Sequence, residues 1–351
     1  MKNSLKSFQI GINPCDTLFF RNGTPFGMGE ETWADSALLP NPSVIWGALF
    51  TRLIQDEIIQ ISDLDALKIK QIFFCELKTG QLHSSTPEVS KMYVPAPLDI
   101  FKVKGYCAEM YTPVLNTDIV SSITPGIQHY SLPKITNEKV DTLDQFWITI
   151  NSLRENYPKR DNRSVIIPNG SIAKPSPKIG IGRNSITKNV EEGYLYRIEM
   201  SELNKNMMVG LEIEAPENFL ATGLLRLGGE GKNVAISAVN FDSQMDVTNS
   251  DSNRFKLYFQ TPSFFESGDG ISELSNLKSA TLLSATIGKP MHIGGFDMAA
   301  RTPKPMRKAV PPGSVFYFEG IDLANVRTEL VSIFEEADTA KGFNGFRIIQ
   351  D

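Results

Sequence analysis

Apolar residues alternate with polar ones along several stretches of the chain. Phe8, Ile10 and Ile12 begin such a stretch and predict a strand over about residues 8–20. The same period of two predicts strands over residues 207–214 and 254–260. Further strands are predicted over residues 70–77, 91–97, 194–200, 234–239, 280–287 and 315–318, and a last strand after the glycine-rich run at 342–345. We expect residues 91–97 to pair antiparallel with residues 70–77, and residues 194–200 to close a first domain.

Helical spacing of apolar residues is rarer. Pro42 or Ser43 starts or caps a helix whose apolar face includes Ile45, Leu49 and Leu53 and which continues to about residue 60. Further helices are predicted over residues 143–153, 216–225 and 325–336. Prolines interrupt the rest of residues 98–190, which we interpret as a long insertion that is partly loop.

The order of these elements predicts an α+β fold. Strand, helix, strand, strand is the first half of a ferredoxin-like unit, and a second pattern of this kind follows it. A chain of 351 residues is also long enough for two domains. We therefore predict two tandem ferredoxin-like (RRM-like) domains, an N-terminal one at residues 1–203 with a loop-rich insertion at about 98–190, and a C-terminal one at residues 204–351.

Composition excludes several classes of protein. The chain is 41% hydrophobic and 21% charged, which is typical of a globular protein. No apolar run approaches the roughly 18 residues of a membrane span, and residues 1–7 are not followed by a signal-peptide core. The three cysteines and three histidines are scattered and form no C-x-x-C or paired-histidine motif. We therefore expect a cytoplasmic protein without membrane contact, disulfides, a metal or another cofactor.

The net charge of −5 argues against a free-standing nucleic-acid binder, but the charge is uneven. Residues 154–190 contain eight Lys or Arg and two acids, a local balance of +6, and residues 301–308 contain four Lys or Arg and no acid. Two basic patches on an acidic background fit local contact with nucleic acid. Two solvated loops explain the same charges equally well.

Residues 225–232, L-R-L-G-G-E-G-K, hold three glycines within four positions. Bare backbone allows another backbone or a phosphate to approach its N–H groups closely. A nucleotide-hydrolysing P-loop would need a glycine where Arg226 stands and a Ser or Thr where Asn233 stands. The loop thus indicates either polyanion binding or a tight turn with a solvated lysine.

A second glycine motif, K-I-G-I-G-R-N at residues 178–184, ends a stretch rich in proline and lysine. It differs from the dinucleotide fingerprint because Ser185 occupies the third glycine position, no strand is predicted before it and no acid is placed as that fold requires. Its composition suits phosphate contact instead, and Arg183 can fork onto a phosphate or stack on a base. No spacing assembles a nucleophile–base pair or a catalytic carboxylate pair.

Four blocks together resemble one family. They are D-T-L-F-F-R-x-G-x-P-F within residues 14–26, W-G-A-L at 46–49, K-I-G-I-G-R-N-x-x-T at 178–187 with E-G-Y-L-Y at 192–196, and the glycine loop at 225–232. In this order they resemble the third subunit of the Cmr complex, the type III-B CRISPR effector, which belongs to the RAMP superfamily. The resemblance runs from about residue 13 to the end, except that residues 98–162 carry no motif of the family.

The resemblance implies a non-catalytic subunit with two ferredoxin-like domains in an antiviral defence complex. Such a subunit caps the foot of the ribonucleoprotein and holds the repeat-derived 5′ tag of the CRISPR RNA. It packs against the large palm-domain subunit and the first backbone subunit, and meets target RNA only indirectly. Target cleavage belongs to the backbone subunits, and cyclic-nucleotide signalling to the palm subunit. Much of an acidic surface would then face protein.

For the RNA contact we expect glycines that expose N–H groups, cations that neutralise phosphates, and asparagines that read base edges. The predicted set is Arg21, Lys178, Gly180, Gly182, Arg183, Asn184, Lys188, Arg226, Gly228, Gly229, Gly231, Lys232, Asn233, Arg301, Lys304, Arg307 and Lys308. Two alternatives stay open. One is a RAMP-family endoribonuclease that processes precursor CRISPR RNA, and the other is a nucleotide-binding enzyme that uses the glycine loop.

Overall fold

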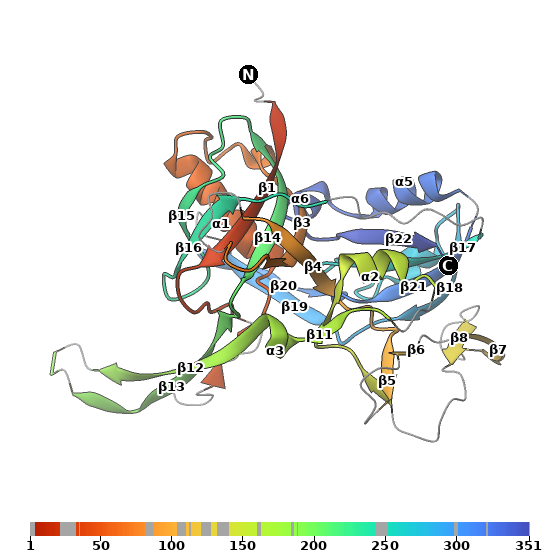
Figure 1. Cartoon of the computed structure of the whole chain (residues 1–351), viewed down its shortest axis with the longest axis horizontal. Helices are drawn as coiled ribbons and strands as arrows, with labels where there is room; N and C mark the ends of the chain where they lie inside the picture. The colour runs from red at the N-terminus through yellow and green to blue at the C-terminus, as the bar shows by residue number, and fades with distance from the viewer. Residues whose placement is uncertain are drawn as a thin grey trace. The chain divides into compact units, whose positions relative to one another are not determined.

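The computed structural model describes residues 4–21, 33–34, 36–81, 87–103, 110–111, 114–120, 128–131, 140–159, 163–183, 186–187, 189–242, 252–297, 301–320 and 322–350 (Figure 1). The chain divides into two compact units. Unit 1 comprises residues 1–90, 169–241 and 293–306, and unit 2 comprises residues 91–168, 242–292 and 307–351. Sheets are mostly antiparallel and helices are few, which agrees with the α+β class. The domain division at residue 203 stays a prediction.

The main sheet of unit 1 is antiparallel. Its neighbouring strands are, in spatial order, β3 (Lys68–Leu77), β14 (Met207–Pro216), β1 (Leu5–Pro14), β16 (Asn233–Ala238) and β15 (Gly223–Arg226). Ile10 and Ile12 on β1 have no exposed surface. The alternating pattern therefore predicted the strand over residues 8–14 correctly, because Phe8, Ile10 and Ile12 point to one face, but β1 ends at Pro14 and does not continue to residue 20.

Helix α1 (Pro42–Gln55) follows β1 in unit 1, after the two-residue strand β2 (Trp33–Ala34). Proline suits the first turn because its missing N–H would have no partner there. Ile45, Leu49 and Leu53 of the predicted face are buried, and Trp46 and Phe50, which the prediction did not include, are buried beside them. The helix ends about five residues earlier than predicted, and the 3₁₀ turn η1 (Leu64–Ala66) lies between it and β3.

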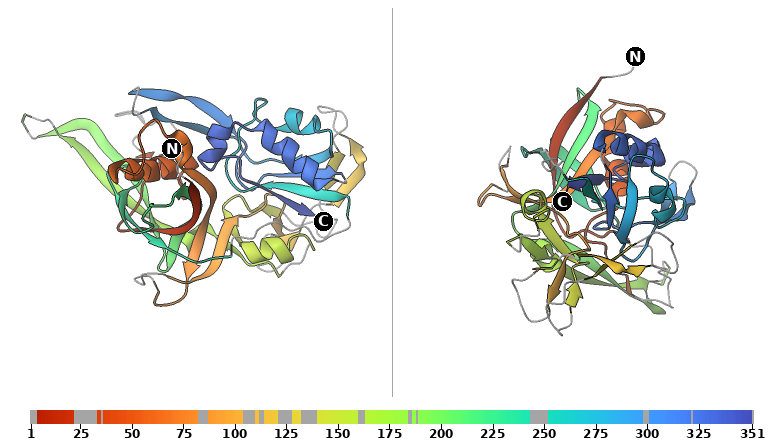
Figure 2. Two further views of the ribbon diagram at one scale, coloured as in Figure 1. Left: turned by 90° about the horizontal axis from the view of Figure 1, so that it is seen from above. Right: turned by 90° about the vertical axis from the view of Figure 1, so that its right-hand side faces the viewer.

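A long two-stranded ribbon also belongs to unit 1. After the short helix α3 (Asn169–Ile172), β12 (Ala173–Arg183) pairs antiparallel with β13 (Val190–Leu203), as Figures 1 and 2 show. The sequence predicted a loop over most of β12, which is wrong. Pro175 and Pro177 are tolerated because β12 is the edge strand of the order β12-β13-β2 and needs no hydrogen-bond donor on its open side.

Two other predictions for unit 1 are corrected. Residues 216–225 form no helix, because Gly223 and Leu224 extend into β15 and pair with Ile236 and Ala235. Strand β13, which was expected to close a first domain, pairs instead with β12 and β2. The strand beside β1 is β14, because its apolar residues cover the same core as Ile10 and Ile12.

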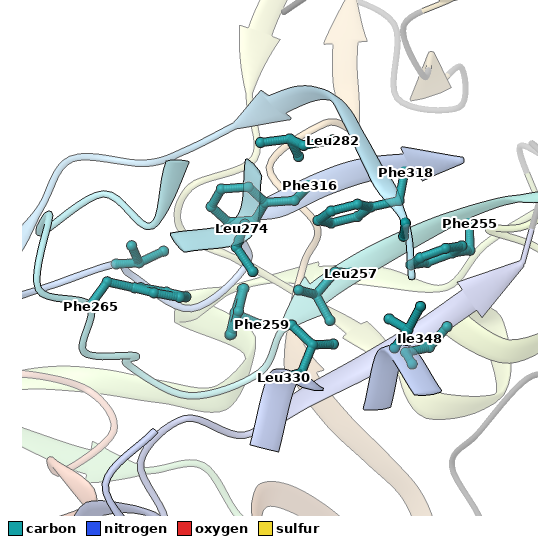
Figure 3. Packing of buried hydrophobic residues seen from close by; sticks show 13 residues of the cluster. Phe255, Leu257, Phe259, Phe265, Leu274, Leu282, Phe316, Phe318, Leu330 and Ile348 are labelled. Atoms are coloured by element: carbon teal, nitrogen blue, oxygen red, sulfur yellow. The ribbon is translucent and has the colours of Figure 1, made fainter. Parts of the chain in front are cut away.

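Unit 2 contains an antiparallel sheet with the spatial order β18-β21-β17-β22. Along the chain these elements are β17 (Arg254–Phe259), α4 (Ile271–Ser275), β18 (Thr281–Thr286), β21 (Val315–Glu319), α5 (Leu323–Ile333), α6 (Glu336–Ala340) and β22 (Phe346–Gln350). Phe259, Phe316 and Leu330 lie in the core between the sheet and its helices (Figure 3). All four strands and α5 were predicted, with small errors at their ends.

Smaller elements complete unit 2. β4 (Val89–Pro95), which enters unit 2 at residue 91, pairs with β10 (Phe146–Thr149), and β10 pairs with β11 (Ile166–Pro168). The helix predicted over 143–153 is strand β10 followed by α2 (Ile150–Glu155), and Thr149 caps α2 by accepting the N–H of Ser152. The remaining strands are β5 (Phe101–Val103), β6 (Met110–Tyr111), β7 (Val114–Val120), β8 (Gln128–Ser131) and β9 (Val140–Thr142).

A buried polar cluster joins these smaller elements to the four-stranded sheet within unit 2. Asp99 is fully buried and accepts hydrogen bonds of 2.8 Å from the hydroxyls of Tyr157 and Tyr317. The ammonium of Lys256, also buried, lies 3.5 Å from Asp99 Oδ2 and 4.3 Å from the centre of the Tyr157 ring. The charged pair is thus compensated by hydrogen bonds and a cation–π contact, as burial requires.

Candidate nucleic-acid interface

The glycine loop of residues 227–232 is a tight hairpin that connects β15 to β16 in unit 1. Leu225 and Leu227 are buried while Arg226 between them is exposed, so the strand pattern reaches into the loop. The N–H of Leu227 donates to the carbonyl of Lys232 at 3.0 Å and closes the turn. Gly228 and Gly231 both have left-handed backbones, with φ of 80° and 63°. We call residues 227–232 the glycine hairpin.

The segment of residues 16–21 fixes this hairpin. Phe19 accepts the N–H of Gly229 at 2.9 Å, and Leu18 exchanges two hydrogen bonds of 2.8 Å with Ser201 on β13. The N–H of Phe20 donates to Ser36 Oγ at 3.0 Å. Two of the blocks that carry the family resemblance, at 14–26 and 225–232, therefore lie in contact in the folded chain.

Close packing explains part of the glycine content. A Cβ on Gly228 would lie 2.7 Å from the carbonyl oxygen of Phe19 and 3.0 Å from the Phe20 ring. A Cβ on Gly229 would lie 3.0 Å from the Phe19 ring, while one on Gly231 would meet nothing within 4 Å. The chain itself thus requires glycine at 228, whereas Gly231 faces open space.

The hairpin also offers hydrogen-bond donors. Within the described part of the chain, the backbone N–H groups of Gly228, Glu230 and Gly231 donate to no acceptor. Left-handed residues in a turn orient successive N–H groups toward the same side, which is the usual backbone geometry of an anion site. The geometry therefore fits a phosphate or another anion.

Both lysines at the hairpin are held by acids. Lys178 Nζ on β12 lies 2.6 Å from Glu230 Oε2, and Lys232 Nζ pairs with Asp16 Oδ2. The hydrogen bond from Lys232, with a second from the backbone N–H of Thr17, lowers the pKa of Asp16 below its ordinary value. The pairs bring three predicted segments together but also reduce the free positive charge.

Arg226 stands apart from these pairs. It is exposed at the end of β15, and no acid of the described residues pairs with it. Asn233, the next predicted residue after the hairpin, is exposed at the start of β16 and uses its backbone carbonyl to accept the N–H of Cys15 at 3.2 Å. Arg21, at the other end of the 16–21 segment, is exposed and forms a backbone bridge with Ser36.

The second glycine motif lies on β12. Gly180 is opposite Tyr196 on β13, and Gly182 and Arg183 end the strand. Ile179 and Ile181 beside them are 68% and 49% exposed, so this part of the ribbon presents apolar side chains to solvent. Two predicted residues of the same block, Asn184 and Lys188, lie outside the described residues.

The basic run at 301–308 is divided between the units. In unit 1, Arg301 has a left-handed backbone, with φ of 54°, just before β20 (Thr302–Ala309), and Lys304 on β20 is exposed. In unit 2, Arg307 pairs with Asp338 at 2.5 Å and lies 3.9 Å from the centre of the Phe264 ring. Lys308 in unit 2 is exposed and its stem packs over Gly268. The sequence missed an exposed phenyl ring near this run, Phe296.

The described residues contain no group of three His, Cys, Asp or Glu side chains arranged to hold a metal ion. In the same part of the chain, none of the helices has the length and apolar character that crossing a bilayer requires.

Comparison with known proteins identifies the family. A family model described as "CRISPR-associated protein (Cas_Cmr3)" matches residues 10–350. No curated protein matches the chain. A chain of the cryo-EM structure of the Type III-B Cmr-beta bound to cognate target RNA and AMPPnP, state 1, is 16% identical, with a TM-score of 0.55 and coverage of 97% of this chain and 98% of that chain. A chain of the Type III-B Cmr-beta bound to cognate target RNA is also 16% identical, with a TM-score of 0.53 and coverage of 97% and 99%. At this identity the two structures show a shared fold.

Proposed function

Because this chain belongs to the Cmr3 family of CRISPR-associated proteins and is a type III-B effector subunit, we propose that it caps that complex and holds the 5′ tag of the CRISPR RNA. Its protein partners are the large palm-domain subunit and the first backbone subunit, and target RNA is met only indirectly. The subunit binds and assembles without cleaving RNA, in the cytoplasm. The two similar structures, which are chains of Type III-B Cmr-beta bound to cognate target RNA, support this assignment.

The glycine hairpin carries the proposal. Three of its backbone N–H groups have no acceptor among the described residues and can donate to a phosphate. The exposed Arg226 adds positive charge. The 16–21 segment fixes the hairpin through Phe19, so little order has to be created when RNA binds. The proposed contact extends along the RNA backbone to Lys232 and to four residues of the ribbon, Lys178, Gly180, Gly182 and Arg183.

We also propose that both units derive from ferredoxin-like domains. In unit 2 the chain order β17-α4-β18-β21-α5-β22 with the spatial order β22-β17-β21-β18 is the arrangement of that fold. In unit 1 the strands β16, β1, β14 and β3 repeat the spatial order, with α1 between β1 and β3. The β15–β16 hairpin stands where a second helix would precede the last strand.

Recovery of bound RNA from the native complex tests the function. The tagged chain, purified from its host, should carry CRISPR RNAs with one shared 5′ repeat tag and a large palm-domain subunit. A preparation without CRISPR RNA and without that subunit would contradict the proposal. Metal-free cleavage of repeat RNA by the purified chain would instead support the endoribonuclease alternative.

The salt dependence of binding tests the site. Arg226→Ala should reduce the slope of log affinity against log salt by about 0.7, the value for one phosphate of a single strand. The matched control is Lys70→Ala on β3, an exposed lysine of the same sheet that pairs with Glu214 at 2.9 Å and is separated from β15 by three strands. Equal slopes for Arg226→Ala and the unsubstituted chain would remove Arg226 from the site.

A further inference from the structure

One aromatic side chain of the ribbon formed by β19 (Met291–Asp297) and β20 lies in solvent. Phe296 on β19 is 54% exposed, and it is the only aromatic residue more than half exposed among those whose burial is described. Most phenyl rings of the chain are in the cores, as in Figure 3. Burying a phenyl side chain is worth about 1.5–3 kcal/mol, so an exposed one marks a surface that gains from being covered.

The residues around Phe296 within unit 1 are glycines, a methionine and a lysine. Gly294 and Gly295 precede it, and the side chain of Met306 lies over Gly294 so closely that a Cβ there would overlap its sulfur. Cδ of Lys304 lies 3.8 Å from the position of a Cβ on Gly295. The glycines thus leave room on β19 for a thioether and a lysine stem from β20, at the two positions that precede Phe296.

Charge selects the class of ligand. Residues 293–306, the part of the β19–β20 ribbon that belongs to unit 1, contain Arg301 and Lys304 against one acid, Asp297. In unit 1, neither Arg301 nor Lys304 pairs with an acid of the described residues. β19 and β20 pair in one ribbon, so these cations and the exposed ring belong to the same small element. A platform for single-stranded nucleic acid combines such groups, since the ring stacks on a base while the cations meet phosphates.

We propose that Phe296, Arg301 and Lys304 form a second contact for single-stranded RNA, in which Phe296 stacks on an unpaired base and the two cations neutralise the adjacent phosphates. Every base has a π-face, so this contact tolerates any sequence. It rests on the proposed RNA-binding function but uses residues other than the glycine hairpin. Phe296 is absent from the residues that the sequence predicted.

Fluorescence anisotropy of a labelled single-stranded RNA of mixed sequence, with the full chain, tests the contact. Phe296→Ala should weaken binding roughly 5- to 150-fold, the effect of losing one stacked base, at an unchanged salt slope. Phe296→Tyr should bind as the unsubstituted chain does. Lys304→Ala should lower the slope by about 0.7. Leu64→Ala, which removes a side chain 60% exposed in the same unit, is the control and should change nothing.

A second readout separates stacking from a structural role. RNA that carries 2-aminopurine should lose fluorescence when the chain binds it, and Phe296→Ala should abolish that quenching. If the unsubstituted chain binds no single-stranded RNA, this inference is overturned, and recovery of CRISPR RNA with the native complex decides the proposed function separately. If it binds and Phe296→Ala binds equally well, only this inference is overturned. The same holds if Phe296→Ala impairs assembly with protein subunits while RNA affinity and quenching stay unchanged.

Discussion

Alanine substitutions in the glycine hairpin separate packing from backbone preference. At Gly231 the new Cβ meets nothing within 4 Å, so only the left-handed backbone opposes it. That conformation costs an L-residue about 1–2 kcal/mol of folding free energy. Alanine also lowers the conformational entropy of the unfolded chain, which offsets about 0.4–1 kcal/mol of that cost. At Gly228 the Cβ would also lie 2.7 Å from the carbonyl oxygen of Phe19. To relieve that clash the two segments must move apart, which lengthens the 2.9 Å hydrogen bond from the N–H of Gly229 to the carbonyl of Phe19. Such a hydrogen bond contributes about 1 kcal/mol to stability.

We therefore expect Gly228→Ala to cost about 2 kcal/mol and Gly231→Ala about 1 kcal/mol. Hydrogen exchange of residues 223–238, followed by mass spectrometry, measures the local opening free energy of β15 and β16 and does not require the two units to unfold together. Gly228→Ala should also weaken RNA binding, because the hairpin separates from the 16–21 segment. Equal protection factors for the two variants would refute the packing argument.

Three further results are expected. Asp99→Ala leaves the buried Lys256 ammonium without its carboxylate and should lower the free energy of unfolding, measured in urea, by about 3–5 kcal/mol. Adding Lys256→Met to this variant should restore a large part of that loss. Gly47→Ala should stabilise α1 by about 0.5–1 kcal/mol, since its Cβ meets nothing and its φ is ordinary, which thermal unfolding checks. The pair with Lys232 lowers the pKa of Asp16, so its stabilising effect should be complete above the unfolded value of 3.8 and disappear as the pH falls through the lower folded value. A carboxyl NMR titration checks this, and Lys232→Met should return the pKa of Asp16 toward 3.8.

Local patterns predicted the elements whose identity depends on one buried face. Ile10 and Ile12 alternate and are fully buried on β1, and Ile45 and Leu49 lie on the buried face of α1. The prediction was wrong where a partner strand decided the structure. Residues 173–183 look like a loop because of their prolines, yet pairing with β13 makes them a strand. Such pairing is a tertiary effect that a window of the sequence does not contain.

The candidate site shows the same division. The sequence identified the glycine hairpin and the basic residues near it, because glycine and charge are visible locally. It did not predict that Lys178 pairs with Glu230, 52 residues away, or that Lys232 pairs with Asp16, 216 residues away. It also missed Phe296, since an isolated phenylalanine in a strand gives no sign of whether it faces the core or the solvent.

The glycines of the hairpin have two different causes, and this changes how the site is assessed. The glycine content of the sequence indicated a backbone that is accessible to phosphate. At positions 228 and 229, however, the close approach of Phe19 is enough to explain why the residue is glycine. Only Gly231 combines a left-handed backbone with open space, and it lies between Glu230 and Lys232, which both belong to ion pairs. A phosphate at Gly231 would therefore meet a free backbone donor and two lysines whose acids it must displace or share. The gain in charge neutralisation is then smaller than the number of cations implies, so we expect the exposed Arg226 and the backbone donors to contribute more of the affinity than the lysines do.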